Sequence, residues 1–204
     1  MEDELSSLIN ALRCLPGVGP RSAQRMVFHL LQHKRQGGLH LAACLEQAMQ
    51  KVHHCTRCNN FTTIDLCKLC RNSARDFTTI CVVEAPADII AIEQSSAFNG
   101  SYFVLMGKIS PLDGLGPEEI RLPDLRALII AENIKEIIIA LSPTVEGQAT
   151  AHFILELLSD QPVKISQLAH GIPCGGELEF LDGLTISNAV RNRVLVQNMV
   201  GTRL

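Results

Sequence analysis

Four of the eight cysteines form two close pairs, Cys55-Thr-Arg-Cys58 and Cys67-Lys-Leu-Cys70, which are separated by eight residues. Each pair can bind one tetrahedral metal ion from a single turn, and two facing pairs complete a shell of four thiolates, as in structural zinc sites. The segment between the pairs is too short for a hydrophobic core, so the metal would stabilise its fold, by about 10–16 kcal/mol in small zinc units. A closed shell leaves no position for a substrate. We therefore expect structural Zn²⁺ and not a catalytic metal.

Other interpretations of the paired cysteines remain open. His53 and His54 directly precede the first pair and could replace a thiolate. A redox dithiol and ordinary disulfides are further alternatives, which two pairs in one short segment favour less. The remaining cysteines lie in apolar stretches and are expected to be buried free thiols of a reducing compartment; they are Cys14, Cys44, Cys81 and Cys174.

A second constellation is the string Leu15-Pro-Gly-Val-Gly-Pro20 between two predicted helices. Apolar residues at helical spacing predict the first helix over 4–14, and Pro20 can start the second, whose inward face would be Met26, Val27, Leu30 and Leu31. The pattern is typical of a helix-hairpin-helix. Backbone amides at the hairpin and at the start of the second helix would form a phosphate site that does not read sequence. Arg21 and Arg25, one helical turn apart, would face this site.

This pattern predicts binding to the DNA backbone, and a plain helical hairpin with surface arginines is the alternative. Gln36-Gly-Gly38 is expected to break the chain before a third helix over 39–52. One face of that helix is apolar and is expected to pack on the first two helices; it comprises Leu41, Leu45, Ala48, Met49 and Val52.

From residue 77 onward, short apolar strands alternate with helices. Strands are predicted over 80–83, 102–106, 137–140 and 163–165, with helices over 87–93, 118–131 and 148–158. Such alternation predicts βαβ units and a mostly parallel sheet. Ligands of these sheets gather at the carboxyl ends of the strands, here Glu84, Gly107 and residues 142–146.

The end of the chain offers fewer signals. A last helix is expected over 181–191, followed by an edge strand at Val194–Val196. His170 lies in a glycine-rich segment and is expected to anchor a turn or an interface, because no nucleophile or second base is near it in the sequence. No glycine motif for nucleotide binding is present.

Charge is distributed unevenly along the chain. Residues 1–75 carry a balance of +5 and residues 76–204 a balance of −8, which gives the net charge of −3. The asymmetry indicates separate partners for the two parts, phosphate for the first and a basic protein for the second, although two solvated surfaces would look the same. Basic residues near the paired cysteines could extend a DNA-facing surface or simply be solvated; they are Arg57, Lys68, Arg71 and Arg75.

Length and composition fit one large or two small domains. The N-terminus is acidic and is not followed by the apolar segment of a signal peptide. No run approaches the roughly 18 apolar residues of a membrane span. We therefore expect a cytoplasmic protein with no membrane partner.

Several motifs occur in a fixed order and together carry a resemblance. They are Leu15-Pro-Gly-Val-Gly-Pro-Arg-Ser-Ala-Gln-Arg25, the four cysteines, Cys81-Val-Val-Glu84, Ile109-Ser-Pro-Leu-Asp-Gly114, Pro143-Thr-Val-Glu-Gly147 and Ala169-His-Gly-Ile-Pro-Cys-Gly-Gly-Glu-Leu178. With them, the chain resembles the RecR family of bacterial recombination mediators over nearly its full length.

The resemblance implies a multi-part α+β fold. A helix-hairpin-helix region would cover residues 1–53, a four-cysteine zinc finger 54–76, an α/β Toprim domain 77–175, and a C-terminal segment with oligomer contacts 176–204. Family members form ring-like homotetramers and have no catalytic activity of their own. They act with RecO, and in some settings RecF, to load RecA onto gapped single-stranded DNA, which implies a location at the nucleoid.

The family's two DNA-contacting positions fall on Arg21 and Arg25, and Arg at the first, commonly Lys in the family, retains the charge. This chain departs from the family pattern in two places. It has Leu141-Ser-Pro-Thr-Val-Glu-Gly-Gln148 where Thr-Asn-Pro-Thr-Val-Glu-Gly-Glu is usual, so one acidic group of the expected RecO-facing surface is lost. Cys174 stands in place of an aliphatic residue.

The main alternative is an enzyme. Toprim domains of topoisomerases, primases and nucleases hold Mg²⁺ with a Glu after the first strand and an Asp-x-Asp pair after a later one. Glu84 matches the first element, but residues 140–143 contain no aspartate, and Asp88 and Glu146 do not restore the pair. We therefore expect a non-enzymatic DNA clamp whose Glu84, Asp88 and Glu146 dock a basic partner. A monomeric helix-hairpin-helix module, which would bind DNA weakly, is a third interpretation.

Overall fold

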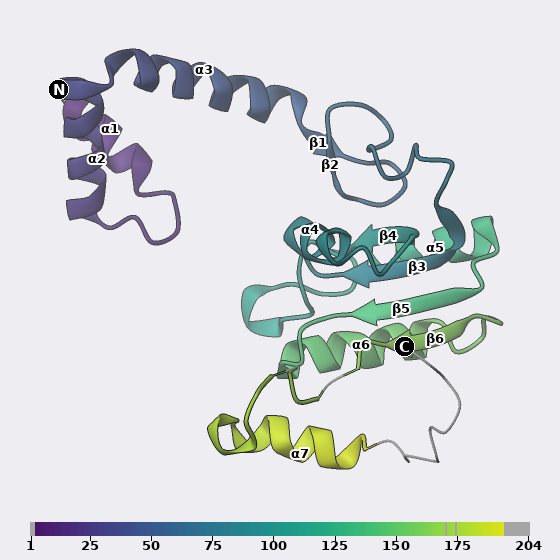
Figure 1. Ribbon diagram of the computed structural model, residues 1–204. Coiled ribbons are helices and arrows are strands. Elements are labelled where there is room, and N and C mark those ends of the chain that lie inside the picture. Colours follow the sequence, from purple (N-terminus) through teal and green to yellow (C-terminus); the bar gives the residue numbers. More distant parts are fainter. Residues whose placement is uncertain (1–2, 170, 174, 194–204) are drawn as a thin grey trace. The chain divides into compact units, whose positions relative to one another are not determined.

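The computed structural model describes residues 3–169, 171–173 and 175–193 (Figure 1). His170, Cys174 and the predicted edge strand Val194–Val196 lie outside the described residues. The chain divides into two compact units, residues 1–53 with 61–64 and residues 54–60 with 65–204, and each is described by itself. None of the helices in the described ranges is long and apolar enough to cross a membrane.

The first unit begins with two helices joined by a tight turn, α1 (Glu4–Leu12) and α2 (Pro20–His33). Asp3 caps α1 by accepting a hydrogen bond from the Leu5 amide at 3.4 Å. Gly17 lies in the turn with φ of +78°, a conformation that favours glycine. Ala23 and Val27 form the buried side of α2. The predicted inward face was therefore too wide, since Met26 and Leu31 are 41% and 40% exposed.

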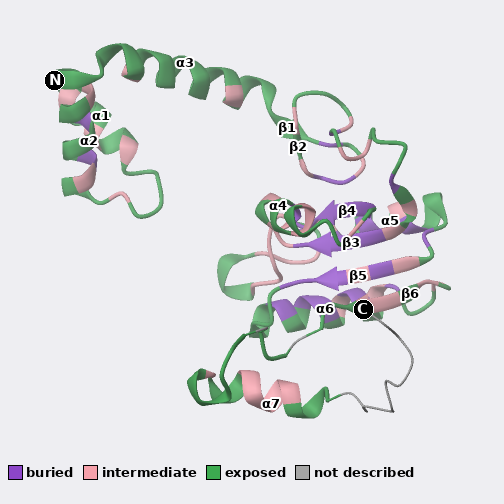
Figure 2. Ribbon diagram, in the orientation of Figure 1, coloured by how far each residue is buried: buried purple, intermediate pink, exposed green. Residues whose placement is uncertain are grey.

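The third helix differs from its prediction in two ways. α3 (Arg35–Lys51) runs through Gly37 and Gly38, so the predicted break is wrong. The chain instead turns at Lys34, whose carbonyl accepts a hydrogen bond from the Gly38 amide at 2.9 Å. The predicted packing of its apolar face is confirmed only in part: Leu41 and Leu45 face α1 and α2, but α3 has no buried residue and Met49 is 77% exposed. Figure 2 shows α3 as largely exposed along its length.

The second unit is built on a four-stranded parallel sheet with the strand order β4-β3-β5-β6. The strands are β3 (Asp76–Val83), β4 (Gly100–Val104), β5 (Glu136–Ala140) and β6 (Lys164–Gln167). Residues 80–83 of β3 and 137–140 of β5 are continuous apolar runs, as is typical of strands that are covered on both sheet faces. Figure 2 shows their residues as mostly buried.

Helices cover the two faces of this sheet. Ile80 and Val82 of β3 point to one face, where they pack with α5 (Leu122–Glu132) and α6 (Val145–Leu157). Cys81 and Val83 alternate to the other face, where they pack with Ile89 of α4 (Pro86–Ser95).

The remaining elements are the strands β1 (His53–His54) and β2 (Phe61–Thr62), the short 3₁₀ helices η1 (Pro111–Asp113) and η2 (Leu178–Phe180), and helix α7 (Gly183–Arg191). The predicted α/β order is confirmed.

Two helices begin at other residues than the sequence predicted, because the capping of their first turns was not anticipated. Pro123 lies in the first turn of α5, which begins at Leu122 and not at Glu118. Helix α6 begins three residues earlier than predicted because the Thr144 hydroxyl accepts a hydrogen bond from the Gly147 amide. Two of the expected buried thiols are in fact exposed, Cys14 and Cys44, because they lie in a helical unit that buries little surface, whereas Cys81 is buried in the sheet.

Candidate metal centre and nucleic-acid interface

The four paired cysteines converge on one point. Their sulfur atoms all lie within 4.8 Å of one another, and the Sγ atoms of Cys58 and Cys67 are 3.5 Å apart. Four sulfurs at the usual Zn–S distance of about 2.3 Å would be about 3.8 Å apart, so the cluster fits a tetrahedral zinc ion.

Histidine does not join this cluster. In the described part of the chain, the only group of His, Cys, Asp or Glu ligand atoms close enough to hold a metal is the four cysteines. The His54 ring contacts the Asn59 carbonyl at 3.1 Å instead. Cys55, Cys58 and Cys67 are buried, and the Cys67 amide donates to the Cys55 sulfur at 3.3 Å. The geometry therefore supports the four-thiolate interpretation.

Asn59, which sequence reasoning missed, joins the first cysteine turn to the sheet. It adopts φ of +62°, and its side-chain amide donates to the Val104 carbonyl at 2.7 Å, next to a bond from the Val104 amide to the Cys58 carbonyl at 2.9 Å. Arg121 donates to the Asn59 side chain at 2.6 Å. An asparagine directly after Cys58 was a usable signal, because Asn tolerates positive φ in tight turns.

Two of the basic residues near the cysteines are structural. The Arg57 side chain is 10% exposed, donates to both carboxylate oxygens of Glu132 and lies over the Phe77 ring. Arg75 is 8% exposed and forms a two-point ion pair with Glu93. The suggestion that these two arginines extend a DNA-facing surface is therefore wrong. Arg71 is exposed, as is Lys68.

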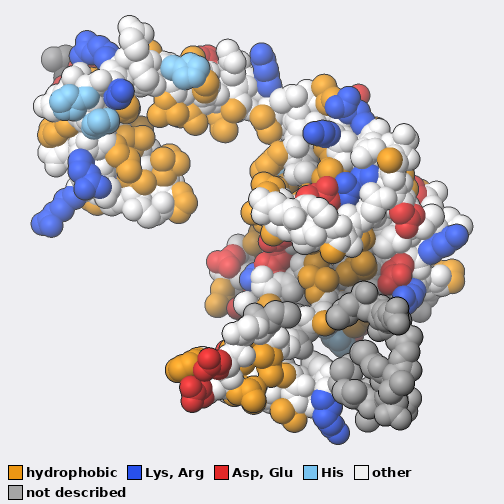
Figure 3. Space-filling model, in the orientation of Figure 1, with side chains coloured by type: hydrophobic (Ala, Val, Ile, Leu, Met, Phe, Trp, Pro, Cys, Tyr) orange, Lys and Arg blue, Asp and Glu red, His pale blue; other side chains and the backbone are white. Residues whose placement is uncertain are grey.

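Arg21 and Arg25 have the opposite character. Both side chains are exposed, and in the described ranges neither forms an ion pair. They lie in the first two turns of α2, whose N-cap Gly19 offers no side-chain hydrogen bond to the first amides. Cationic side chains next to uncapped amides favour an anion such as a phosphate. Figure 3 shows Lys and Arg side chains projecting from the helical unit.

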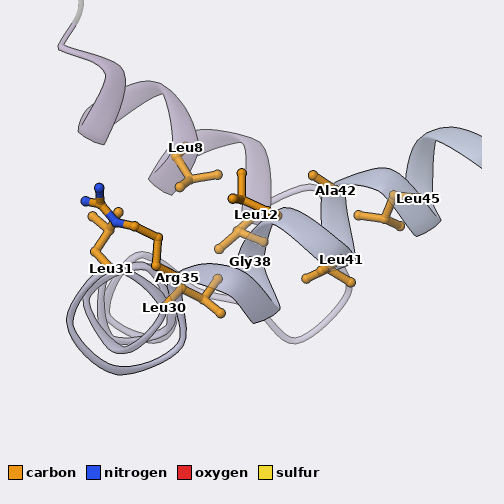
Figure 4. Close-up of a pocket in the computed structure, with 10 residues that line it drawn as sticks. Leu8, Leu12, Leu30, Leu31, Arg35, Gly38, Leu41, Ala42 and Leu45 are labelled. Carbon is orange, nitrogen blue, oxygen red and sulfur yellow. The ribbon is translucent and has the colours of Figure 1, made fainter.

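The same unit contains an apolar groove of about 570 Å³ formed by its three helices. Figure 4 shows leucines from α1, α2 and α3 that point toward one another across it. Leu12, Leu30 and Leu41 are among its lining residues, and the exposed face of α3 continues it. An open apolar groove of this kind is a surface that association with another molecule could bury.

The predicted acidic residues lie at the carboxyl ends of β3 and β5, but two of them face inward. Glu84 Oε1 accepts a hydrogen bond from the Ser142 amide at 2.6 Å, and Lys108 Nζ lies 3.8 Å from Glu84 Oε2. Asp88 accepts from the Ala85 amide at 2.8 Å and caps α4. Glu146 is exposed in the first turn of α6. The three carboxylates do not form a metal-holding group within the described residues.

Lys108 is a second residue of this region that was not predicted from the sequence. Its ammonium group lies 3.3 Å from the Thr144 hydroxyl and close to Glu84. A lysine directly after Gly107, at the end of a strand, gave only a weak signal, because its partners come from distant parts of the sequence. It supplies a positive charge beside Glu84 from the protein itself.

The fold and site define a class, a Toprim protein with a helix-hairpin-helix and a zinc finger of four cysteines. Family models match residues 5–49 (RecR, helix-hairpin-helix), 52–72 (RecR, four-cysteine zinc finger domain), 78–169 (Toprim domain) and 171–194 (RecR, C-terminal). The Recombination protein RecR of Legionella pneumophila strain Corby is 69% identical over 194 residues, covering 95% of this chain and 98% of the relative. That of strain Philadelphia 1 is 68% identical over the same shares. The chain belongs to the RecR family, and its four-cysteine site is a structural zinc site.

Proposed function

We propose that this protein is a non-enzymatic mediator of recombinational DNA repair that binds the DNA backbone through Arg21 and Arg25. It acts with RecO, and in some settings RecF, to help load RecA onto gapped single-stranded DNA. The observation that carries the proposal is the pair of exposed arginines beside the uncapped start of α2, which form no ion pair with the residues that the structure describes. Contacts to phosphate alone would make binding independent of sequence and sensitive to salt.

The DNA-binding form is a ring-like homotetramer. The apolar groove and the exposed face of α3 support self-association, because a stable monomer gains nothing from leaving so much apolar surface in water. Several copies of Arg21 and Arg25 would then act on one DNA strand, and their weak phosphate contacts would add through effective concentration.

Residues 76–204, which carry the charge balance of −8, provide the surface for a basic partner. Glu146 is exposed and is the best placed of the predicted carboxylates to meet RecO, whereas Glu84 and Asp88 hold backbone amides of their own chain. Glu84 and Asp88 contribute to the negative field of this surface and fix its loops. We propose domain limits at 53/54, 76/77 and 175/176 and action at the nucleoid in the cytoplasm.

Two features support a role without catalysis. The Glu84 carboxylate is engaged by Ser142 and Lys108, and residues 140–143 at the carboxyl end of β5 contain no aspartate. Mg²⁺ needs several oxygen ligands, and a neighbouring ammonium group opposes a second cation. This end of the sheet is therefore a binding platform.

The test is fluorescence anisotropy of labelled gapped DNA across a salt series with Mg²⁺ present. We expect Arg21→Ala/Arg25→Ala to weaken binding and to reduce the salt slope by about 0.7 per lost single-strand phosphate contact. Lys34→Ala/Lys51→Ala removes the same charge from the same unit and should bind nearly as the wild type does. Equal binding by both double variants would refute the hairpin site, and cleaved or religated DNA on a subsequent gel would refute the non-enzymatic role.

A further inference from the structure

Phe28 lies on the face of α2 that does not build the core. The buried side of this helix is Ala23 and Val27, and Phe28 is 39% exposed. Its neighbours at helical spacing are Gln24 and Arg25 on one side and Leu31 and Gln32 on the other. A shallow hollow of about 450 Å³ formed by α2 alone is lined by Phe28 together with Arg21, Gln24, Arg25, His29, Gln32 and His33. An exposed aromatic ring thus lies beside the two arginines.

Packing does not explain this phenylalanine. Phe28 belongs to none of the buried hydrophobic clusters formed by the described residues. It is also absent from the lining of the apolar groove, to which α2 contributes Leu30 and Leu31.

The residues around the Phe28 ring favour a polyanionic ligand that carries aromatic groups. Helix α2 contains no acidic residue, and Arg21 and Arg25 provide two positive charges on the N-terminal side of Phe28, the nearer within about one turn. Bases of a single strand expose their faces and stack on aromatic side chains, whereas bases in a duplex are already stacked on each other. The Gln24 and Gln32 amides can donate to and accept from base edges or sugars.

We propose that Phe28 stacks on an unpaired base while Arg21 and Arg25 hold phosphates on one side of that base, so that this face of α2 binds single-stranded DNA in preference to duplex. The inference rests on the proposed function, because it uses the same two arginines. Stacking is tolerant of base identity, so the preference is for strand type and not for sequence.

The first experiment compares a labelled single strand with its own duplex by anisotropy. Phe28→Ala should weaken single-strand binding about tenfold, within the range measured for base–aromatic stacking, and change duplex binding less than about twofold. Equal loss on both substrates, or no loss on either, would overturn the stacking proposal. If Arg21→Ala/Arg25→Ala has no effect on either substrate, the proposed function itself fails.

The second experiment uses the absence of tryptophan from the chain. Phe28→Trp introduces one fluorophore at the proposed contact, keeps an aromatic ring there and should retain single-strand binding. Its emission should be quenched by single-stranded DNA and much less by duplex. Phe180→Trp, at a 79% exposed phenylalanine of the other unit, is the matched control and should not be quenched. Quenching by both DNA forms, or a shift in oligomeric state of Phe28→Ala by sedimentation, would overturn the assignment.

Discussion

Replacing Gly147 by alanine should destabilise the second unit, although alanine is the better helix former. Gly147 lies in the first turn of α6, and its amide donates to the Thr144 hydroxyl at 3.1 Å. A Cβ atom at this position would lie 2.0 Å from the Ser142 carbonyl oxygen and 3.1 Å from its carbon. These are backbone atoms, and the Ser142 amide is held by Glu84. No side-chain rotation can therefore relieve the contact.

The magnitude follows from two opposing terms. Alanine is favoured over glycine within a helix by about 1 kcal/mol. Overpacking of a rigid site costs about 1–3 kcal/mol and occasionally more. A 2.0 Å contact with a backbone oxygen lies at the upper end of that range. We expect a net loss of about 2 kcal/mol in the free energy of unfolding, or about thirtyfold in the ratio of folded to unfolded protein.

Urea denaturation followed by circular dichroism measures this change. Gly38→Ala is the matched control. Gly38 lies in helix α3, and an added Cβ atom would be 3.8 Å from Leu30 Cβ of α2, an ordinary van der Waals contact. That variant should be neutral or more stable by up to about 1 kcal/mol. A midpoint for Gly147→Ala at or above that of the wild type would refute the reasoning from the Ser142 contact.

Three further predictions concern the second unit. Cys67→Ser should lose most of the bound zinc measured by elemental analysis, while Cys44→Ser, an exposed thiol outside the cluster, should keep it; equal zinc content would contradict the four-thiolate site. Hydrogen bonds from Arg75 lower the pKa of Glu93, so the stability they add is present above the ordinary glutamate pKa of about 4.3 and is lost as pH falls through the lowered value. The stability advantage of the wild type over Glu93→Gln, from urea titrations at each pH, should therefore shrink in acid, and an advantage independent of pH would rule this out. Arg57→Lys keeps the charge but loses the two-point geometry, and should cost about 1–2 kcal/mol in the same titration; an unchanged midpoint would show that the charge alone suffices.

Local spacing was sufficient for several features. The cysteine pairs predicted their own cluster because two residues between ligands fix a turn whatever surrounds it. The Leu15–Pro20 string predicted the helical hairpin for the same reason, since Gly17 and Pro20 restrict the backbone directly. Apolar strands separated by helices likewise predicted the parallel sheet, because only a sheet covered on both faces buries such runs.

Features that depend on distant partners were predicted poorly. The apolar face of α3 has the same periodicity whether it packs on its own chain or awaits another molecule, so its exposure could not be inferred from the sequence. Arg57 and Arg75 looked like surface charges, because Glu132 and Glu93 that bury them lie far along the chain. Glu84 looked available for a ligand until the fold placed Ser142 and Lys108 beside it.

The sequence by itself therefore determined the paired cysteines, the hairpin and the alternation of strands and helices, since these follow from the conformational limits of neighbouring residues. Tertiary structure alone decided which charged side chains are available to a ligand. A charged side chain is engaged or left exposed depending on the groups that the fold places beside it. Arg21 and Arg25 are exposed, whereas Arg57 and Arg75 are largely buried. The exposed Phe28 lies on the same helix as Arg21 and Arg25. That difference is the physical basis for placing the DNA contact on α2.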